Sequence, residues 1–158
     1  MVVIRNGQAC ELDEPVVIGD ETMPREGAVV VSGRRWLEED AGLARRGNVG
    51  LRLAPDFDVE LLEGKLDGVE LIEIEFPRFS DGRGYSLARL LRERLLYPGE
   101  LRAVGDVLPD QLRYMSRCGF DSFALKPGKR VDTALKALGH LSATYQPATD
   151  GARPHWRT

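Results

Sequence analysis

The chain has 158 residues, a length that suits one domain with its own core. Hydrophobic residues make up 42% and charged residues 30%, as in an ordinary globular protein, and the net charge of -3 argues against a nucleic-acid binder, which is normally basic. We expect a single α/β domain over 1–146, with a hairpin and loop over 1–27, βα repeats over 28–146 and a flexible tail over 147–158.

Cysteine content and the N-terminus predict a cytoplasmic protein. Cys10 and Cys118 are too few for a disulfide framework, and no Cys/His spacing indicates a metal site. The first residues lack the basic and apolar regions of a signal peptide, and no apolar run reaches the ~18 residues of a membrane span. We therefore expect no membrane partner.

The N-terminal segment predicts a β-hairpin. Asn6-Gly7 accepts the positive φ angles of a type I′ turn, and it separates apolar segments at Val2–Arg5 and Gln8–Leu12. Val16–Ile18 predicts a further short strand.

From residue 28 onward, short apolar runs alternate with segments of helical period, a pattern typical of βα units in a mainly parallel sheet. The expected strands are 28–32, 49–53, 70–76, 101–105, 122–125 and 142–146. The expected helices are 34–46, 58–67, 85–96, 107–118 and 131–140.

Charged residues interrupt the central strands at Arg52, Glu73, Glu75 and Arg102. Alternation along a strand puts Glu73 and Glu75 on one face. This pattern indicates either a charged layer inside a curved sheet, like part of a (β/α) barrel, or an open doubly wound sheet with one face partly exposed. We favour the curved sheet.

The turn after the strand at 70–76 is the candidate ligand site. Its glycines let the backbone approach a ligand, the N–H groups at a helix start attract an anion, and guanidinium groups can fork onto the anion's oxygens. The candidate ligand-binding residues are Arg78, Ser80, Asp81, Gly82, Arg83, Gly84, Tyr85 and Ser86. We expect Arg83 to be the principal charged ligand and the Gly84 and Tyr85 N–H groups to complete the cradle.

An alternative makes this turn purely structural, with Asp81 or Ser80 capping the helix and the arginines paired with Glu73 and Glu75. Asp106 follows the next strand and is the candidate catalytic acid or base, because α/β folds place chemistry at the carboxyl ends of their strands.

Other polar residues have simpler interpretations. Cys118 ends a predicted helix, where the dipole disfavours a thiolate, and we expect a buried thiol. Lys126 starts an exposed turn, which favours a solvated lysine over a Schiff-base lysine. Arg89, Arg92 and Arg94 lie on one predicted helix, and they indicate a solvated face or, alternatively, a docking face for a partner.

Several motifs carry a family resemblance over about 28–125. They are Phe76-Pro77-Arg78-Phe79, Asp81-Gly82-Arg83-Gly84-Tyr85-Ser86, Arg89-Leu90-Leu91-Arg92, Gly99-Glu100-Leu101-Arg102-Ala103, Gly105-Asp106-Val107-Leu108, Asp110-Gln111-Leu112 and Arg117-Cys118-Gly119-Phe120-Asp121. At these motifs the chain resembles a small bacterial family, domain of unknown function 934, whose members are described as oxidoreductases of sulfite reduction.

The resemblance implies a role in sulfur assimilation beside sulfite reductase or a related enzyme. No flavin, nicotinamide, haem or cluster motif is recognisable, so a redox role would need a partner that carries the electrons. We expect an accessory protein of assimilatory sulfite reduction that binds a small oxyanion. The alternatives are a small-molecule enzyme with its site at the strand carboxyl ends, and a purely structural partner protein.

Overall fold

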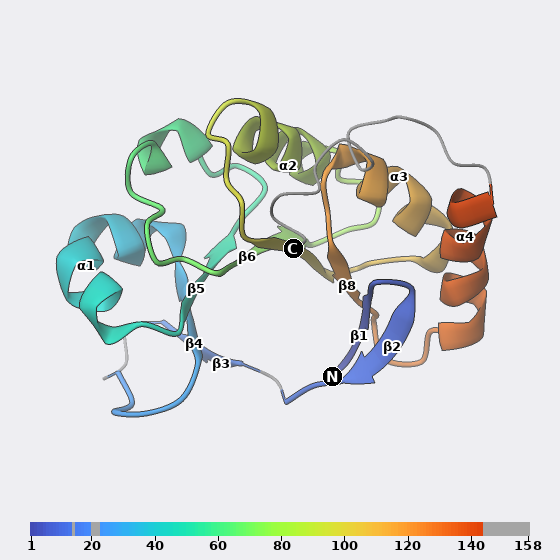
Figure 1. Ribbon diagram of the computed structural model, residues 1–158, viewed down its shortest axis with the longest axis horizontal. Coiled ribbons are helices and arrows are strands. Elements are labelled where there is room, and N and C mark those ends of the chain that lie inside the picture. The colour runs from blue at the N-terminus through green and yellow to red at the C-terminus, as the bar shows by residue number, and fades with distance from the viewer. Residues whose placement is uncertain (14, 20–22, 144–158) are drawn as a thin grey trace.

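A computed structural model describes residues 1–13, 15–19 and 23–143 (Figure 1). The strands are β1 (Val2–Arg5), β2 (Gln8–Glu11), β3 (Val16–Ile18), β4 (Val29–Ser32), β5 (Val49–Leu53), β6 (Leu71–Phe76), β7 (Glu100–Gly105) and β8 (Ser122–Ala124). The α-helices are α1 (Gly33–Arg46), α2 (Arg83–Glu93), α3 (Leu112–Cys118) and α4 (Val131–Ala143), and two 3-10 helices are η1 (Val59–Leu62) and η2 (Pro109–Gln111).

The eight strands form one sheet in the order β2-β1-β8-β7-β6-β5-β4-β3. The six strands from β3 to β8 are parallel neighbours in chain order, and the β1–β2 hairpin adds to β8 in the antiparallel sense. Connections between parallel strands are right-handed. Because β3 to β8 follow one another in a single direction across the sheet, the helices in these connections all lie on one face. Figure 1 shows the sheet curled with α1 to α4 around its outside. The predicted curved sheet, a half barrel, is confirmed.

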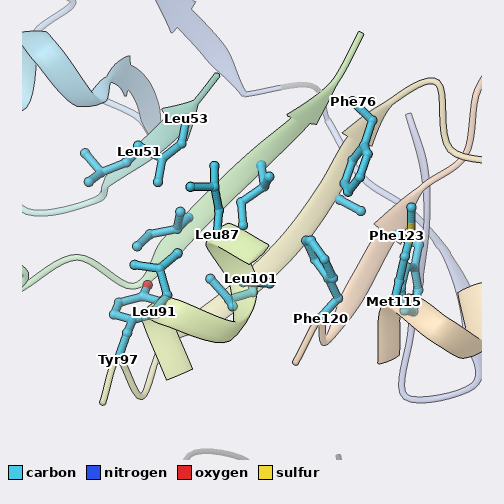
Figure 2. Close-up of a cluster of buried hydrophobic side chains, with 14 of the residues drawn as sticks. Leu51, Leu53, Phe76, Leu87, Leu91, Tyr97, Leu101, Met115, Phe120 and Phe123 are labelled. Carbon is cyan, nitrogen blue, oxygen red and sulfur yellow. The ribbon is translucent and has the colours of Figure 1, made fainter. Parts of the chain in front are cut away.

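The main core fills the space between the sheet and the helices. On β6, Ile72, Ile74 and Phe76 are fully buried and point to this outer side, as the alternation in their sequence requires. Figure 2 shows Leu87 and Leu91 of α2 packed over the strands. Because one side chain in two along each strand belongs to this core, the others face the inside of the curve.

The N-terminal hairpin is confirmed. Asn6 and Gly7 have φ angles of 52° and 72°, the left-handed values of the predicted turn, and Arg5 pairs with Gln8 across it. The hairpin places Val3 opposite Ala124, so the first strand extends the sheet beyond β8.

Three predicted elements were wrong in extent or type. The segment expected as a helix over 58–67 is only the short η1, because Gly64 turns the chain with a φ angle of 72°. The helix expected over 107–118 begins at Pro109 as η2 before α3. The strand expected at 142–146 is wrong at its start, since α4 continues to Ala143, and 144–146 lie outside the described residues, as does the predicted tail.

The interpretation of the arginine-bearing helix is wrong for Arg92. Its side chain is buried, and it donates hydrogen bonds to the carbonyl oxygens of Tyr97, Gly99 and Gly119. It also forms an ion pair with Asp121. Arg92 therefore holds α2 to the loops before β7 and β8, and it is not available for docking.

Candidate functional site

The loop after β6 and the loop after β7 are fastened together at the carboxyl edge of the sheet. Gly105, with a φ angle of 95°, lies so close to β6 that an added Cβ would be 2.4 Å from the Phe76 carbonyl oxygen. The next residue, Asp106, donates its N–H to that oxygen at 2.7 Å. Its carboxylate accepts the Phe79 N–H at 2.9 Å, and Gln111 donates from its side chain to the Phe79 carbonyl oxygen at 2.9 Å.

Asp106, the candidate acid or base, is thus engaged through both of its oxygens. The second oxygen lies 3.3 Å from Lys126 Nζ. The Phe79 N–H, and after it Lys126, keep the pKa of Asp106 below its ordinary value, so the group is ionised at neutral pH. An ionised carboxylate can act as a base but not as an acid, and its catalytic role stays a prediction.

In the turn before α2, Arg83 is paired with Asp81. The Asp81 carboxylate accepts the Arg83 backbone N–H at 3.1 Å and two guanidinium hydrogen bonds at 3.0 and 2.7 Å. These bonds lower the pKa of Asp81 to about 2. The expected alternative partners of Arg83, Glu73 and Glu75, do not contact it. Asp81 accepts the N–H of Arg83, the first residue of α2, but the N-cap residue is Gly82 and no side chain among the described residues caps the helix. Capping by Asp81 or Ser80, as the structural alternative had it, is therefore not seen.

The remaining predicted ligand residues are dispersed around this turn. Arg78 and Ser80 are exposed, and Arg78 has no hydrogen-bond or ion-pair partner within the described part of the chain. The Tyr85 N–H donates to the Gly82 carbonyl oxygen at 3.3 Å. Gly84 is buried against the Phe76 ring. Binding of an oxyanion at this turn therefore stays a prediction. To bind the anion, the Arg83 guanidinium would have to contact it and Asp81 at the same time.

A row of charged side chains crosses the inner face of the half barrel. Neighbouring strands place Arg52 beside Glu73, Glu73 beside Arg102, Arg102 beside Ser122, and Ser122 beside Arg5. Glu73 is fully buried, 2.6 Å from Arg52 and 3.6 Å from Arg102. This row is the charged layer that the strand sequences predicted.

Glu100 completes the row between Arg102 and Arg5. Its carboxylate lies 2.9 Å from Arg102 and 3.0 Å from Arg5, and it accepts a hydrogen bond from the Ser122 hydroxyl. Burial works to raise the pKa of Glu100, but the Ser122 hydroxyl and the two arginines hold it below its ordinary value. Glu100 is therefore ionised at neutral pH.

The next row toward the carboxyl edge is apolar except for one residue. Glu75 lies beside Val104 on β7, and Ala124 on β8 lies beside Val3 on β1. Val3, Val104 and Ala124 form a small hydrophobic cluster with Met1 and Leu12 packed on it. Glu75 is thus a half-buried carboxylate next to an apolar surface.

A cavity of about 530 Å³ opens above this second row. Its size is that of a small-molecule site. Its lining combines Glu75 with the cationic Arg52, Lys126 and Lys129 and with apolar side chains from the sheet and the N-terminal segment. The full lining is Met1, Val2, Pro15, Val17, Arg52, Glu75, Val104, Gly105, Ala124, Leu125, Lys126, Pro127, Gly128, Lys129 and Val131.

Sequence reasoning missed this combination. The sequence indicates a charged layer for Arg52 and Glu75 and a solvated turn for Lys126, and it predicts no ligand site for any of the three. Period-2 alternation puts Arg52 and Glu75 on the inner face, and that signal could have joined them to Lys126. Cys118, in contrast, is buried as predicted.

Within residues 1–13, 15–19 and 23–143, no helix combines the length and apolar character needed to cross a membrane. The same residues hold no group of three or more His, Cys, Asp or Glu side chains arranged to bind a metal ion.

These observations define an α/β half-barrel protein with a polar inner face and a cavity at the carboxyl edge of its sheet. The chain belongs to the family described as bacterial protein of unknown function (DUF934), whose model matches residues 50–156. The motifs predicted this family, although the match begins later and ends later than the resemblance over 28–125. The comparison with curated proteins found no match.

Proposed function

We propose that this chain is an accessory protein of assimilatory sulfite reduction in the cytoplasm, working beside a reductase that carries the redox cofactors. The resemblance carried by the sequence motifs supports the setting, because it implies sulfite reduction, whereas the family to which the chain belongs is described as of unknown function. The observation that carries the accessory role is a group of aromatic side chains here called the aromatic corner: the exposed Phe79 and Tyr114, and the half-buried Tyr85 beside Tyr114. Gln111, three residues before Tyr114, is hydrogen-bonded to the Phe79 carbonyl oxygen.

The aromatic corner has the composition of a protein interface. Phe79 and Tyr114 are 51% and 52% exposed, and the Tyr85 and Tyr114 rings lie 4.9 Å apart. Arg78 precedes Phe79, and the exposed Arg89 lies four residues after Tyr85 on α2. Aromatic residues and arginine are the types enriched where proteins bind each other.

The backbone under this corner is already fixed. Phe79 is held at its N–H by Asp106 and at its carbonyl oxygen by Gln111, at the start of the segment that leads to Tyr114. A preformed loop loses little conformational entropy on binding, which favours docking. The arginines suit an acidic surface on the reductase.

Co-purification with the host's sulfite reductase, followed by a sulfite-reduction assay with and without the chain, tests the proposal. The double variant Phe79→Ala/Tyr114→Ala should abolish association and the effect on the reductase. Leu61→Ala, which removes a side chain that is 54% exposed on η1, should change neither. Unchanged reductase activity, level and assembly on deletion of the gene would contradict the accessory role.

The same proposal includes a small oxyanion at the Ser80–Ser86 turn. Arg78 supports it, since this exposed guanidinium has no partner within the described residues. Calorimetric titration of sulfite, sulfate and phosphate into wild type, Arg78→Ala and Arg83→Ala provides the test. Binding that weakens in both variants is the expected result. Absence of binding, with Arg83→Ala only lowering the melting temperature, would make the turn a structural ion-pair site.

A second candidate, a small-molecule enzyme, is favoured by the cavity at the carboxyl edge. A chromophore seen in the absorbance spectrum of the purified chain would favour this enzyme over the accessory protein.

A further inference from the structure

The cavity on the inner face has the carboxylate of Glu75 on one side and the ammonium groups of Lys126 and Lys129 on the other. The third cation of its lining, Arg52, lies near Glu75 on the neighbouring strand but is already paired with Glu73 at 2.6 Å. Glu75 lies on β6, and Lys126 and Lys129 lie in the turn that follows β8. β6 and β8 are separated by β7, so the two sides are about 10 Å apart across the sheet. Between the two sides, Val104 on β7 and Ala124 on β8 form the apolar floor of the cavity.

Glu75 is an inner-face carboxylate that the described residues leave without an ion pair. Glu73, two residues earlier on the same face, is neutralised by Arg52 and Arg102. Glu75 has no hydrogen-bond or ion-pair partner among the residues that the structure describes, although it is half-buried beside Val104. Glu75 is partly desolvated by this apolar surface, and a cation or N–H donor that reaches its carboxylate would stabilise it. A ligand that enters the cavity can supply that group.

The opposite side of the cavity suits an acid group. The turn is held by a hydrogen bond from the Lys129 N–H to the Lys126 carbonyl oxygen at 3.1 Å, with Gly128 at a φ angle of 86°. The ammonium group of Lys126 is shared with Asp106 at 3.3 Å, whereas Lys129 has no ion-pair partner within the described residues. Lys129 is therefore the main cation available to an anionic group.

We propose that this cavity binds a small zwitterionic organic molecule whose ammonium group pairs with Glu75, whose acid group pairs with Lys129 and Lys126, and whose apolar stem lies on Val104 and Ala124. The site is distinct from the Ser80–Ser86 turn and from the aromatic corner. It does not depend on a role in sulfite reduction.

Calorimetry on the full chain tests the charge pattern with simple probes. These are γ-aminobutyrate and ε-aminocaproate, which carry both charges, together with caproate, hexylamine and inorganic phosphate, which carry one sign only. At least one of the two zwitterions should bind about tenfold tighter than caproate, hexylamine or phosphate, because it alone makes both charge-assisted contacts. Methyl resonances of Val104 and Ala124 should shift with the same saturation curve.

Two variants test which residue binds each charged group of the zwitterion. Glu75→Gln should reduce the affinity for the zwitterion to that for caproate, and Lys129→Met should reduce it to that for hexylamine. Glu93→Gln, on the exposed outer side of α2, is the matched control and should leave binding unchanged. Melting curves establish that each variant is folded. Equal binding of zwitterion and caproate, no effect of Glu75→Gln, or no binding of either zwitterion would overturn the proposal.

Discussion

The buried side chain of Arg92 forms hydrogen bonds with the two loops that precede β7 and β8. Its guanidinium reaches carbonyl oxygens at Tyr97, Gly99 and Gly119, with distances from 2.7 to 3.1 Å, and the carboxylate of Asp121. Asp121 in turn accepts the Leu101 N–H at 3.0 Å. A planar guanidinium with five N–H donors can satisfy such a set, whereas a lysine with a single ammonium centre cannot.

We expect Arg92→Met to lower the free energy of unfolding by about 3–5 kcal/mol, because it leaves the carboxylate of Asp121 and several carbonyl oxygens without their donor. Arg94→Met is the control on the same helix. Its ion pair with Glu60 is exposed, so its loss should cost less than about 1 kcal/mol. Urea denaturation of both variants measures the difference, and equal effects would show that Arg92 is not structurally important.

The position of Arg92 could have been inferred from the helix period alone. Gly84, Leu87, Ala88 and Leu91 are buried at helical spacing, and Arg92 is the next position of that stripe. What the sequence could not supply was its partners, because these carbonyl oxygens belong to loops whose conformation depends on tertiary packing. Arg83 is a different case, because its partner Asp81 lies two residues earlier in the same turn and the alternative partners considered for it were on β6.

At the scale of elements, the contact between α2 and β6 depends on Gly84. A Cβ at this position would lie 2.6 Å from the Phe76 ring and 3.2 Å from Ile74. The Phe76 ring cannot readily move, since it is fully buried with its centroid 5.3 Å from that of Tyr85 and 5.8 Å from that of Phe120. Gly84 therefore lets the start of α2 pack directly on the sheet.

Gly84→Ala should destabilise the protein by about 1–3 kcal/mol, because overpacking outweighs the better helix propensity of alanine. Gly139→Ala in α4 is the opposite case. An added Cβ there has no neighbour within 4 Å, so the change should raise stability by up to about 1 kcal/mol. Thermal denaturation followed by circular dichroism compares the two variants. A stabilising Gly84→Ala would mean that α2 can shift away from β6.

The elements that the sequence predicted well are those with strong local signals. The Asn6-Gly7 turn, the apolar runs of β4 to β7 and the Gly119 stop after α3 all depend on nearby residues, and Gly119 has the expected positive φ angle of 117°. The extents of η1 and α4 were predicted poorly. Whether a short periodic segment continues as a helix depends on the surface on which it packs, and no local pattern encodes that surface.

At the scale of the whole molecule, the half barrel leaves its inner face without the opposing strands that a closed barrel would provide. The sheet ends at β2 and β3, and charged residues fill the first inner row in place of a second packed layer. The alternation of Glu73 and Glu75 predicted that row. It could not distinguish the paired carboxylate from the one that lines the cavity, because both follow from the same period of two.

Loss of charge at Glu73 and at Glu75 should affect the free energy of unfolding to different extents. Glu73→Gln leaves Arg52 and the buried Arg102 without a shared counter-charge, so we expect the free energy of unfolding to fall by about 3–5 kcal/mol. Glu75→Gln removes a carboxylate that has no ion pair within the described residues, and stability should stay within about 0.5 kcal/mol of wild type or rise. Urea denaturation at neutral pH measures both. Similar losses in the two variants would mean that Glu75 also stabilises the fold and would remove the reason for assigning it to a ligand.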